Sequence, residues 1–330
     1  EVRRVILAEA AIVVPIGAIY VGADHGFALG PSLAAAFSVL ATAWLQIGTS
    51  VRLVLLRLAE RYTAAYRAEL AGGLLRLILV GCLLAVSALS ALAALVTGAL
   101  AAAVVFALSH SETARPAPGD RSLARRRLLR YLLPTLPSAL YFAVQGPLMI
   151  WLAATFGGTR NIAEIGALGR LGMITGLVSG LSGAVLIPRL AAVMEERAFA
   201  LRFLGYGALL ATLVGTICLV AAAAPGLFLW ILGSNYRGLD QELLLLLVGS
   251  SLAVLGAYVG GVNFVRGWVK LQAVTLVGEI AVQAGLISIL SLSTTTGVLW
   301  FQIGGATAGL IFQLGILAIG LLRPNRVAWS

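Results

Sequence analysis

Long apolar runs separated by short polar gaps dominate the 330-residue chain. Each run is close to the roughly 20 residues that an α-helix needs to cross a bilayer, and none alternates apolar with polar residues as barrel strands do. The runs cover residues 5–25, 32–56, 70–88, 90–109, 129–156, 163–188, 201–223, 241–265, 271–292 and 297–322. This pattern predicts an all-α integral membrane protein with about ten transmembrane helices. A composition of 60% hydrophobic and 11% charged residues also excludes a water-soluble fold.

The placement of the basic residues predicts the topology. Of the 23 Lys and Arg residues, 20 lie in or beside one alternating set of gaps; the other set holds only Arg160 and Arg237, and Arg170 lies within a helix. By the positive-inside rule, both ends of this chain are expected on the cytoplasmic side. The net charge of +10 is therefore explained by topology, and nucleic acid is not an expected partner.

One break in composition, at residues 110–127, divides the chain. Pro, Gly and charged residues gather there, which predicts a cytoplasmic linker between an N-terminal helical lobe (1–109) and a C-terminal six-helix lobe (128–330). Many transporters have two equal halves, so four helices followed by six suggest that two are missing before Glu1 and that the first lobe is truncated. A basic segment at 57–76, with Tyr62 and Tyr66 one helical turn apart, predicts an amphipathic stretch at the cytoplasmic interface.

Signals for an enzyme or a metal site are missing from the sequence. The two histidines, His25 and His110, lie far from any carboxylate pair or cysteine, and Cys82 and Cys218 lie inside apolar runs. No nucleotide-binding loop or nucleophile elbow is present. We therefore expect no catalytic residues, no metal and no cofactor.

The helix at 129–156 carries one polar face. Ser138, Tyr141 and Gln145 follow at i, i+3 and i+7, in a helix that Pro134, Pro137 and Pro147 allow to bend. Their hydroxyl and amide groups suit sugars or a neighbouring helix. The sequence leaves cavity lining and interhelical packing open.

The helix at 163–188 carries a stripe of glycines and one arginine. The glycines are Gly166, Gly169, Gly172, Gly176, Gly180 and Gly183. Such a stripe predicts close packing against another backbone or a sliding surface for a rocking motion. Arg170 projects about 100° away from the stripe. An arginine at that depth is costly, so it either binds a substrate anion or forms a structural pair or snorkels to the interface.

The helix at 271–292 carries a second polar stripe, formed by Gln272, Thr275, Glu279 and Gln283. Glu279 lies about 12 Å into the membrane from the cytoplasmic end, where burial favours the neutral carboxyl. Glu279 could carry a coupling proton, or it could bond to a neighbouring helix. Asn263, Gln302 and Gln313 add uncharged amides that suit sugar hydroxyls or helix contacts.

Short motifs add a family resemblance. Segment 128–189 has a Leu-Pro-x-x-Pro helix start, Tyr141, Gln145, a Phe-Gly-Gly turn, an Ala-Glu-Ile-Gly-Ala-Leu-Gly-Arg-Leu run and a closing Ile-Pro-Arg. It resembles the start of the second lobe in bacterial polysaccharide transporters. These are the O-antigen and exopolysaccharide flippases of the multidrug/oligosaccharidyl-lipid/polysaccharide (MOP) exporter superfamily. The Arg-Leu-Ala-Glu-Arg-Tyr segment from Arg57 is similar to the connection after their fourth helix.

The resemblance implies a two-lobe flippase for a polyprenyl-pyrophosphate-linked oligosaccharide, working by alternating access in the bacterial inner membrane. Arg170, with Arg160 near the outer mouth, would bind the diphosphate, and Tyr141 and Gln145 would contact the sugars. Gln283 is a further expected substrate-binding residue. The expected partners are the lipid-linked substrate, membrane lipid and a polysaccharide polymerase or export assembly, and the expected state is a monomer.

Besides a purely structural partner within a polysaccharide export assembly, two alternatives stay open at this point. One is a drug or metabolite exporter of the same superfamily, which a cavity dominated by carboxylates would favour for cationic drugs. The other is a membrane-embedded lipid-modifying enzyme, which would need a convergent acid or histidine pair.

Overall fold

The computed structural model describes residues 29–58, 61–87, 90–112, 121–193, 195–233, 236 and 238–322. This part of the chain is helical and contains no β-strand. It divides into two compact units, Glu1–Gly119 and Asp120–Ser330. The boundary lies inside the 110–127 segment, although α5 already begins at Arg121. The apolar run expected at 5–25 lies outside the described residues.

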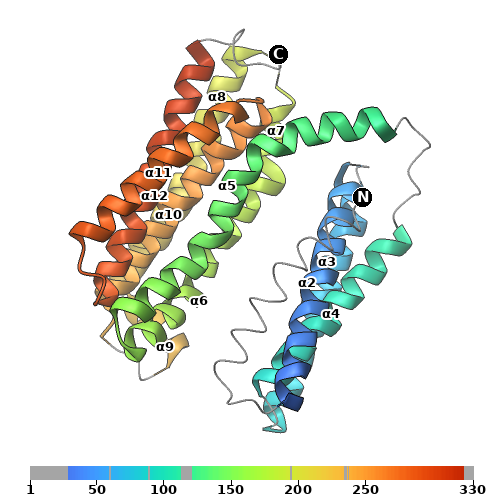
Figure 1. The fold of residues 1–330 in the computed structure, drawn as a ribbon, viewed down its shortest axis with the longest axis vertical. Helices are drawn as coiled ribbons and strands as arrows, with labels where there is room; N and C mark the ends of the chain where they lie inside the picture. Colours follow the sequence, from blue (N-terminus) through green and yellow to red (C-terminus); the bar gives the residue numbers. More distant parts are fainter. Residues whose placement is uncertain are drawn as a thin grey trace. The chain divides into compact units, whose positions relative to one another are not determined.

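The first unit contains three described helices, drawn in blue to cyan in Figure 1: α2 (Leu29–Leu58), α3 (Tyr62–Ala85) and α4 (Ala91–Glu112). Both α2 and α3 pack against α4. Arg52 joins α2 to α4, because its guanidinium carbon lies 3.7 Å from the centre of the Phe106 ring. Its Nη1 also donates a hydrogen bond of 3.2 Å to the backbone oxygen of Phe106.

The expected interfacial segment at 57–76 is not a separate element. Helix α3 starts at Tyr62 and runs without a break to Ala85, and it is long and apolar enough to cross a membrane. An ion pair of 2.8 Å between Arg57 and Glu69 joins the end of α2 to α3. The prediction was wrong because the apolar residues that follow Leu70 extend the same helix instead of starting a new one.

In its described residues, the second unit contains six long helices and three short elements. They are α5 (Arg121–Phe156), α6 (Thr159–Leu181), a π-helical turn (Ser182–Leu186), α7 (Ile187–Ala191), α8 (Glu196–Ala223), α9 (Pro225–Leu232), α10 (Asp240–Val265), α11 (Val269–Ile289) and α12 (Thr295–Leu322). Helix α10 is central, since it packs against α6, α8 and α12, while α11 packs between α5 and α12 (Figure 1). The core of this unit is apolar and includes Leu168, Leu210, Leu247 and Leu299.

Most of these helices have membrane-spanning length. In the described ranges, seven helices are long and apolar enough to cross a bilayer, or eight if the two halves of α5 form one span. Helix α5 bends by 44° between Leu136–Gly146 and Leu148–Phe156. Pro147 lies at the break and has no N–H to continue the helical hydrogen bonds, so the bend expected from the prolines is present. The chain is therefore an all-α, multi-span membrane protein.

Candidate functional site

A cavity of about 940 Å³ lies inside the second unit, between α5, α6, α10, α11 and α12. Its size is typical of sites for small organic molecules. Most of its wall is glycine and apolar side chains. The polar residues in its lining are Gln145, Thr175, Ser179, Ser250, Gln272, Glu279, Gln283, Gln302 and Gln313.

One wall of the cavity is the glycine stripe of α6. Gly166, Gly169, Gly172 and Gly176 line the cavity. A Cβ atom added at Gly166, Gly169 or Gly176 would meet no atom within 4 Å. The close packing against another backbone that the stripe suggested is therefore not found at these three positions. The glycines here leave out side-chain volume and so enlarge the cavity.

The polar face predicted on α5 lies next to α11. Gln145 lines the cavity, and the buried hydroxyl of Tyr141 has the side-chain amides of Gln145 and Gln283 as polar neighbours. No hydrogen bond of good geometry reaches Tyr141 Oη or the buried Ser138 Oγ from the described residues. The structure thus brings Tyr141, Gln145 and Gln283 together, while their part in substrate binding stays a prediction.

The polar stripe predicted on α11 faces the cavity at three of its four positions, Gln272, Glu279 and Gln283. The Glu279 side chain is buried, with 5% of its residue surface exposed. Within the described part of the chain, no hydrogen bond or ion pair joins it to another residue. Its role as a coupling site stays a prediction, but its position on the cavity wall is the one that such a role requires.

Two glycines of α12 make room for these α11 side chains. A Cβ atom at Gly305 would lie 3.0 Å from Gln283 Nε2, and one at Gly309 would lie 3.7 Å from Glu279 Oε1. Because a larger residue at Gly305 would push against the amide, this glycine allows Gln283 to lie against α12.

Asn263 on α10 and Gln313 on α12 form a buried amide pair. The Asn263 side chain is fully buried, and its Nδ2 donates to both the backbone oxygen of Gln313 at 2.8 Å and Gln313 Oε1 at 3.0 Å. Gly260 accommodates this contact, since a Cβ atom there would lie 3.3 Å from Gln313 Oε1. The sequence marked both amides but could not show that they meet, because 50 residues separate them.

The two arginines expected to bind an anion lie away from the cavity lining. Arg170 is exposed, and Arg160 forms an ion pair of 2.7 Å with Glu164 one helical turn further along α6. Among the described residues, the lining holds one carboxyl, Glu279, and no Lys or Arg. The cavity therefore does not provide the cationic surface that a diphosphate needs. The anion role of Arg170 stays a prediction without support from the cavity.

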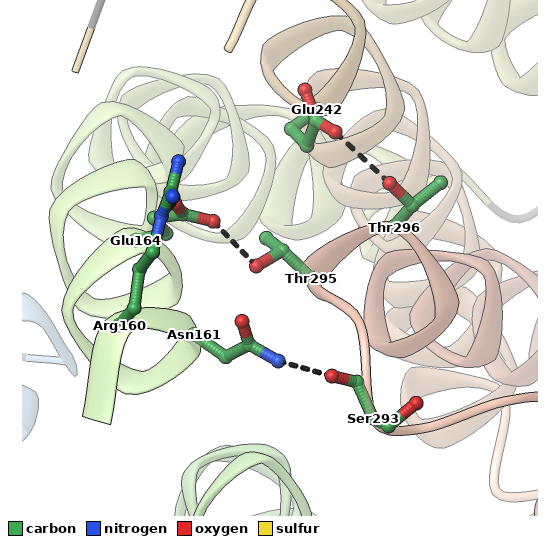
Figure 2. A network of polar contacts seen from close by, with 7 residues as sticks. All are labelled: Arg160, Asn161, Glu164, Glu242, Ser293, Thr295 and Thr296. Carbon is green, nitrogen blue, oxygen red and sulfur yellow. Dashed lines mark hydrogen bonds and ion pairs between the residues drawn. The ribbon is translucent and has the colours of Figure 1, made fainter. Parts of the chain in front are cut away.

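A polar network joins α6, α10 and α12 where α12 begins (Figure 2). Its members are Arg160, Asn161, Glu164, Glu242, Ser293, Thr295 and Thr296. Thr295 donates a hydrogen bond of 2.7 Å to Glu164, and Thr296 donates one of 2.9 Å to Glu242. Asn161 Nδ2 donates to the backbone oxygen of Ser293. Sequence reasoning missed this network, because its partners lie up to 132 residues apart.

In the ranges that the structure covers, no three His, Cys, Asp or Glu side chains gather closely enough to hold a metal ion. The groups that the described lining offers to a ligand are the Glu279 carboxyl, several side-chain amides and hydroxyls, and an apolar wall.

Comparisons with known proteins give the fold a precedent. No family model matches the chain, and no curated protein matches it. Solved structures match at low sequence identity. A MATE transporter in its bent conformation has a TM-score of 0.70 at 17% identity, over 96% of this chain and 75% of that one. The straight conformation gives 0.68 at 16% identity, over 98% of this chain and 76% of that one.

A third structure, an outward-facing multidrug resistance MATE family transporter of the MOP superfamily, gives a TM-score of 0.58 at 19% identity. That match covers 96% of this chain and 76% of the other. At these identities the similarity shows the fold, which is the helical fold of the MATE structures.

Proposed function

We propose that this chain is part of a MOP-superfamily membrane transporter that exports an amphipathic organic molecule by alternating access. The observation that carries the proposal is the cavity of about 940 Å³ among membrane-length helices, with the Glu279 carboxyl in its wall and no ion-pair partner for that carboxyl among the described residues. The likeness of the fold to MATE transporters supports it. We place the protein in a bacterial cytoplasmic membrane as a monomer, with the ends of this chain on the cytoplasmic side.

Glu279 is the proton-coupling residue in this proposal. Its carboxyl lines the cavity without an ion-pair partner among the described residues. An unpaired charge in apolar surroundings is costly, so the carboxyl either binds a proton or attracts a ligand group that compensates its charge. Proton binding and substrate binding at Glu279 therefore influence each other, which is the relation that proton-driven export requires.

Translocation of a lipid-linked oligosaccharide is the second candidate function. The amides of Gln145, Gln283 and Gln313 in the lining favour it, because amides both donate to and accept from hydroxyl groups. The diphosphate of such a substrate needs cationic side chains, and the described lining holds none. This lack favours the exporter over the flippase. A lipid-modifying enzyme has no support from the cavity, since the described residues of the lining bring no second carboxyl or histidine to Glu279.

Transport by the full chain in proteoliposomes tests the proposal. We expect an imposed proton gradient to drive uptake of a lipophilic fluorescent dye into inside-out vesicles. Glu279→Gln should abolish the response to the gradient, while Glu196→Gln, a matched change at an exposed carboxylate at the start of α8, should leave it intact.

The same vesicles distinguish the two candidates. Movement of a polyprenyl-pyrophosphate-linked saccharide without movement of the dye would replace the exporter proposal with the flippase. Movement of neither molecule would contradict transport as proposed here.

A further inference from the structure

The amide pair Asn263–Gln313 fixes which end of the Gln313 side chain is free. The backbone oxygen of Gln313 can only accept, so the Asn263 atom that lies 2.8 Å from it must be the donor Nδ2. The second hydrogen of the same nitrogen points to the side-chain oxygen of Gln313, at 3.0 Å. The orientation of both amides therefore follows from one backbone carbonyl and does not depend on an arbitrary choice between oxygen and nitrogen.

With its oxygen held by Asn263, Gln313 has only its Nε2 group left to interact. The side chain is buried to more than nine-tenths, with 8% exposed, and it lines the cavity. No described residue accepts a hydrogen bond from Nε2. The Nε2 group is therefore a donor on the cavity wall that a ligand bound in the cavity can meet with an acceptor.

Gln313 continues a row of polar groups along α12. On α11, Gln283 lies against Gly305 of α12 and Glu279 lies against Gly309. Because Gly305, Gly309 and Gln313 follow at intervals of four residues, the three polar side chains lie along successive turns of one face of α12. Positions four residues apart in a helix are about 6 Å apart along its axis. We call Gln283, Glu279 and Gln313 the polar ladder.

We propose that the polar ladder binds an uncharged, oxygen-rich part of the ligand, with a ligand oxygen accepting from Gln313 Nε2 and Asn263 acting as the residue that positions it. This inference rests on the proposed function and names the substrate class of its cavity. The ladder offers an amide donor at Gln313 and an amide with both a donor and an acceptor at Gln283, which match hydroxyl, ether and carbonyl groups. An anion meets no cationic partner in the described lining, and a cation at the Gln313 position meets an N–H donor instead of an acceptor.

A pair of coumarins tests the inference. One carries a glucose unit at its 7-oxygen and the other a methyl group, so they share the apolar body and differ in the uncharged, oxygen-rich part. Their affinities are measured by fluorescence for the full chain in nanodiscs, with empty nanodiscs subtracted. For the unmodified protein we expect the glucoside to bind more tightly than the methyl ether.

Two variants remove the donor or its positioning. Gln313→Met keeps the length of the side chain and deletes its amide, and Asn263→Val releases the amide from its fixed orientation. Each should reduce the preference for the glucoside about threefold to tenfold, the effect of losing one neutral hydrogen bond, while the affinity for the methyl ether is unchanged. Gln241→Met is the matched control, because Gln241 is exposed in the first turn of α10.

The inference fails if the unmodified protein shows no preference, or if Gln313→Met retains it. Because Gln313→Met removes only the amide, it decides the question even where Asn263→Val does not fold. Proton-driven dye transport is recorded in parallel, so that the two proposals can fail separately. A preference that depends on Gln313 without any transport would uphold the ladder and contradict the exporter, and the reverse result would do the opposite.

Discussion

Thr295, the first residue of α12, donates a hydrogen bond of 2.7 Å to the carboxylate of Glu164 on α6 (Figure 2). The neighbouring Thr296 makes the same kind of bond to Glu242 on α10. Two carboxylates from different helices thus meet the start of α12, where backbone N–H groups and the helix dipole favour negative charge. The arrangement fixes the position of α12 relative to α6 and α10.

Removing the Thr295 hydroxyl should weaken this arrangement. Thr295→Val keeps the shape of the side chain but leaves the nearly buried Glu164 carboxylate without that donor. We expect a loss of about 1–3 kcal/mol in the free energy of unfolding, measured by thermal or denaturant unfolding in detergent. In the control Thr216→Val, the lost bond is to Thr212 of the same exposed helix face, and little change is expected. An equal loss of unfolding free energy in both variants would show that the bond to Glu164 contributes no more than an exposed bond within one helix.

Adding a side chain to the glycine wall should block the cavity without unfolding the protein. A Cβ at Gly176 meets nothing within 4 Å, so Gly176→Leu can place its side chain in the cavity. We expect thermal stability to be retained and dye transport to fall several-fold. Gly215→Leu on α8 is the matched control, since that site is also open but lies outside the lining. Unchanged transport in Gly176→Leu would mean that the substrate does not use this wall.

The first unit offers a test of close packing. A Cβ added at Gly48 would lie 2.6 Å from Phe106 Cε2, and it would displace the ring that carries the Arg52 contact. We expect Gly48→Ala to destabilise the unit by about 1–3 kcal/mol, although alanine is the better helix former. Gly98→Ala in α4, where nothing lies within 4 Å, should stabilise it by up to about 1 kcal/mol. The measurement is the unfolding midpoint of each variant, and a gain in stability for Gly48→Ala would contradict the packing described here.

The variant Arg170→Gln distinguishes the two candidate functions. Because it is exposed and outside the lining, we expect Arg170→Gln to leave transport of the dye and binding of the coumarin glucoside unchanged. Arg202→Gln, at an exposed position of α8, is the comparison for the loss of one surface charge. A selective loss of pyrophosphate-linked saccharide movement in Arg170→Gln would restore the anion role predicted from the sequence.

Much of the fold can be predicted from hydropathy alone, because in a bilayer the backbone must satisfy its hydrogen bonds within each segment. Nine of the ten apolar runs coincide with described helices, and the exception at 5–25 lies outside them. The error at 57–76 arose because arginines near the start of α3 resemble an interfacial segment when the continuing helix is not seen.

The site could be predicted only as far as helical periodicity reaches. The stripe of Gln272, Glu279 and Gln283 was found because one face of one helix repeats every three or four residues. The Asn263–Gln313 pair and the Glu164–Thr295 bond join different helices, so no local pattern signals them. The glycines of α6 were ambiguous for another reason, since an absent side chain allows either a close neighbour or an empty space.

The contact between α11 and α12 has a consequence for how their sequences can vary. Gly278 on α11 faces the Phe312 ring, where a Cβ would lie 2.6 Å from Cζ, and Gly304 on α12 faces Leu286, with a Cβ at 2.6 Å from Cδ1. Large and small residues are thus paired across the interface, and the order of size reverses from one pair to the other. A bulky residue at 278 can be tolerated only if 312 shrinks with it, so each helix limits the mutations that the other can accept.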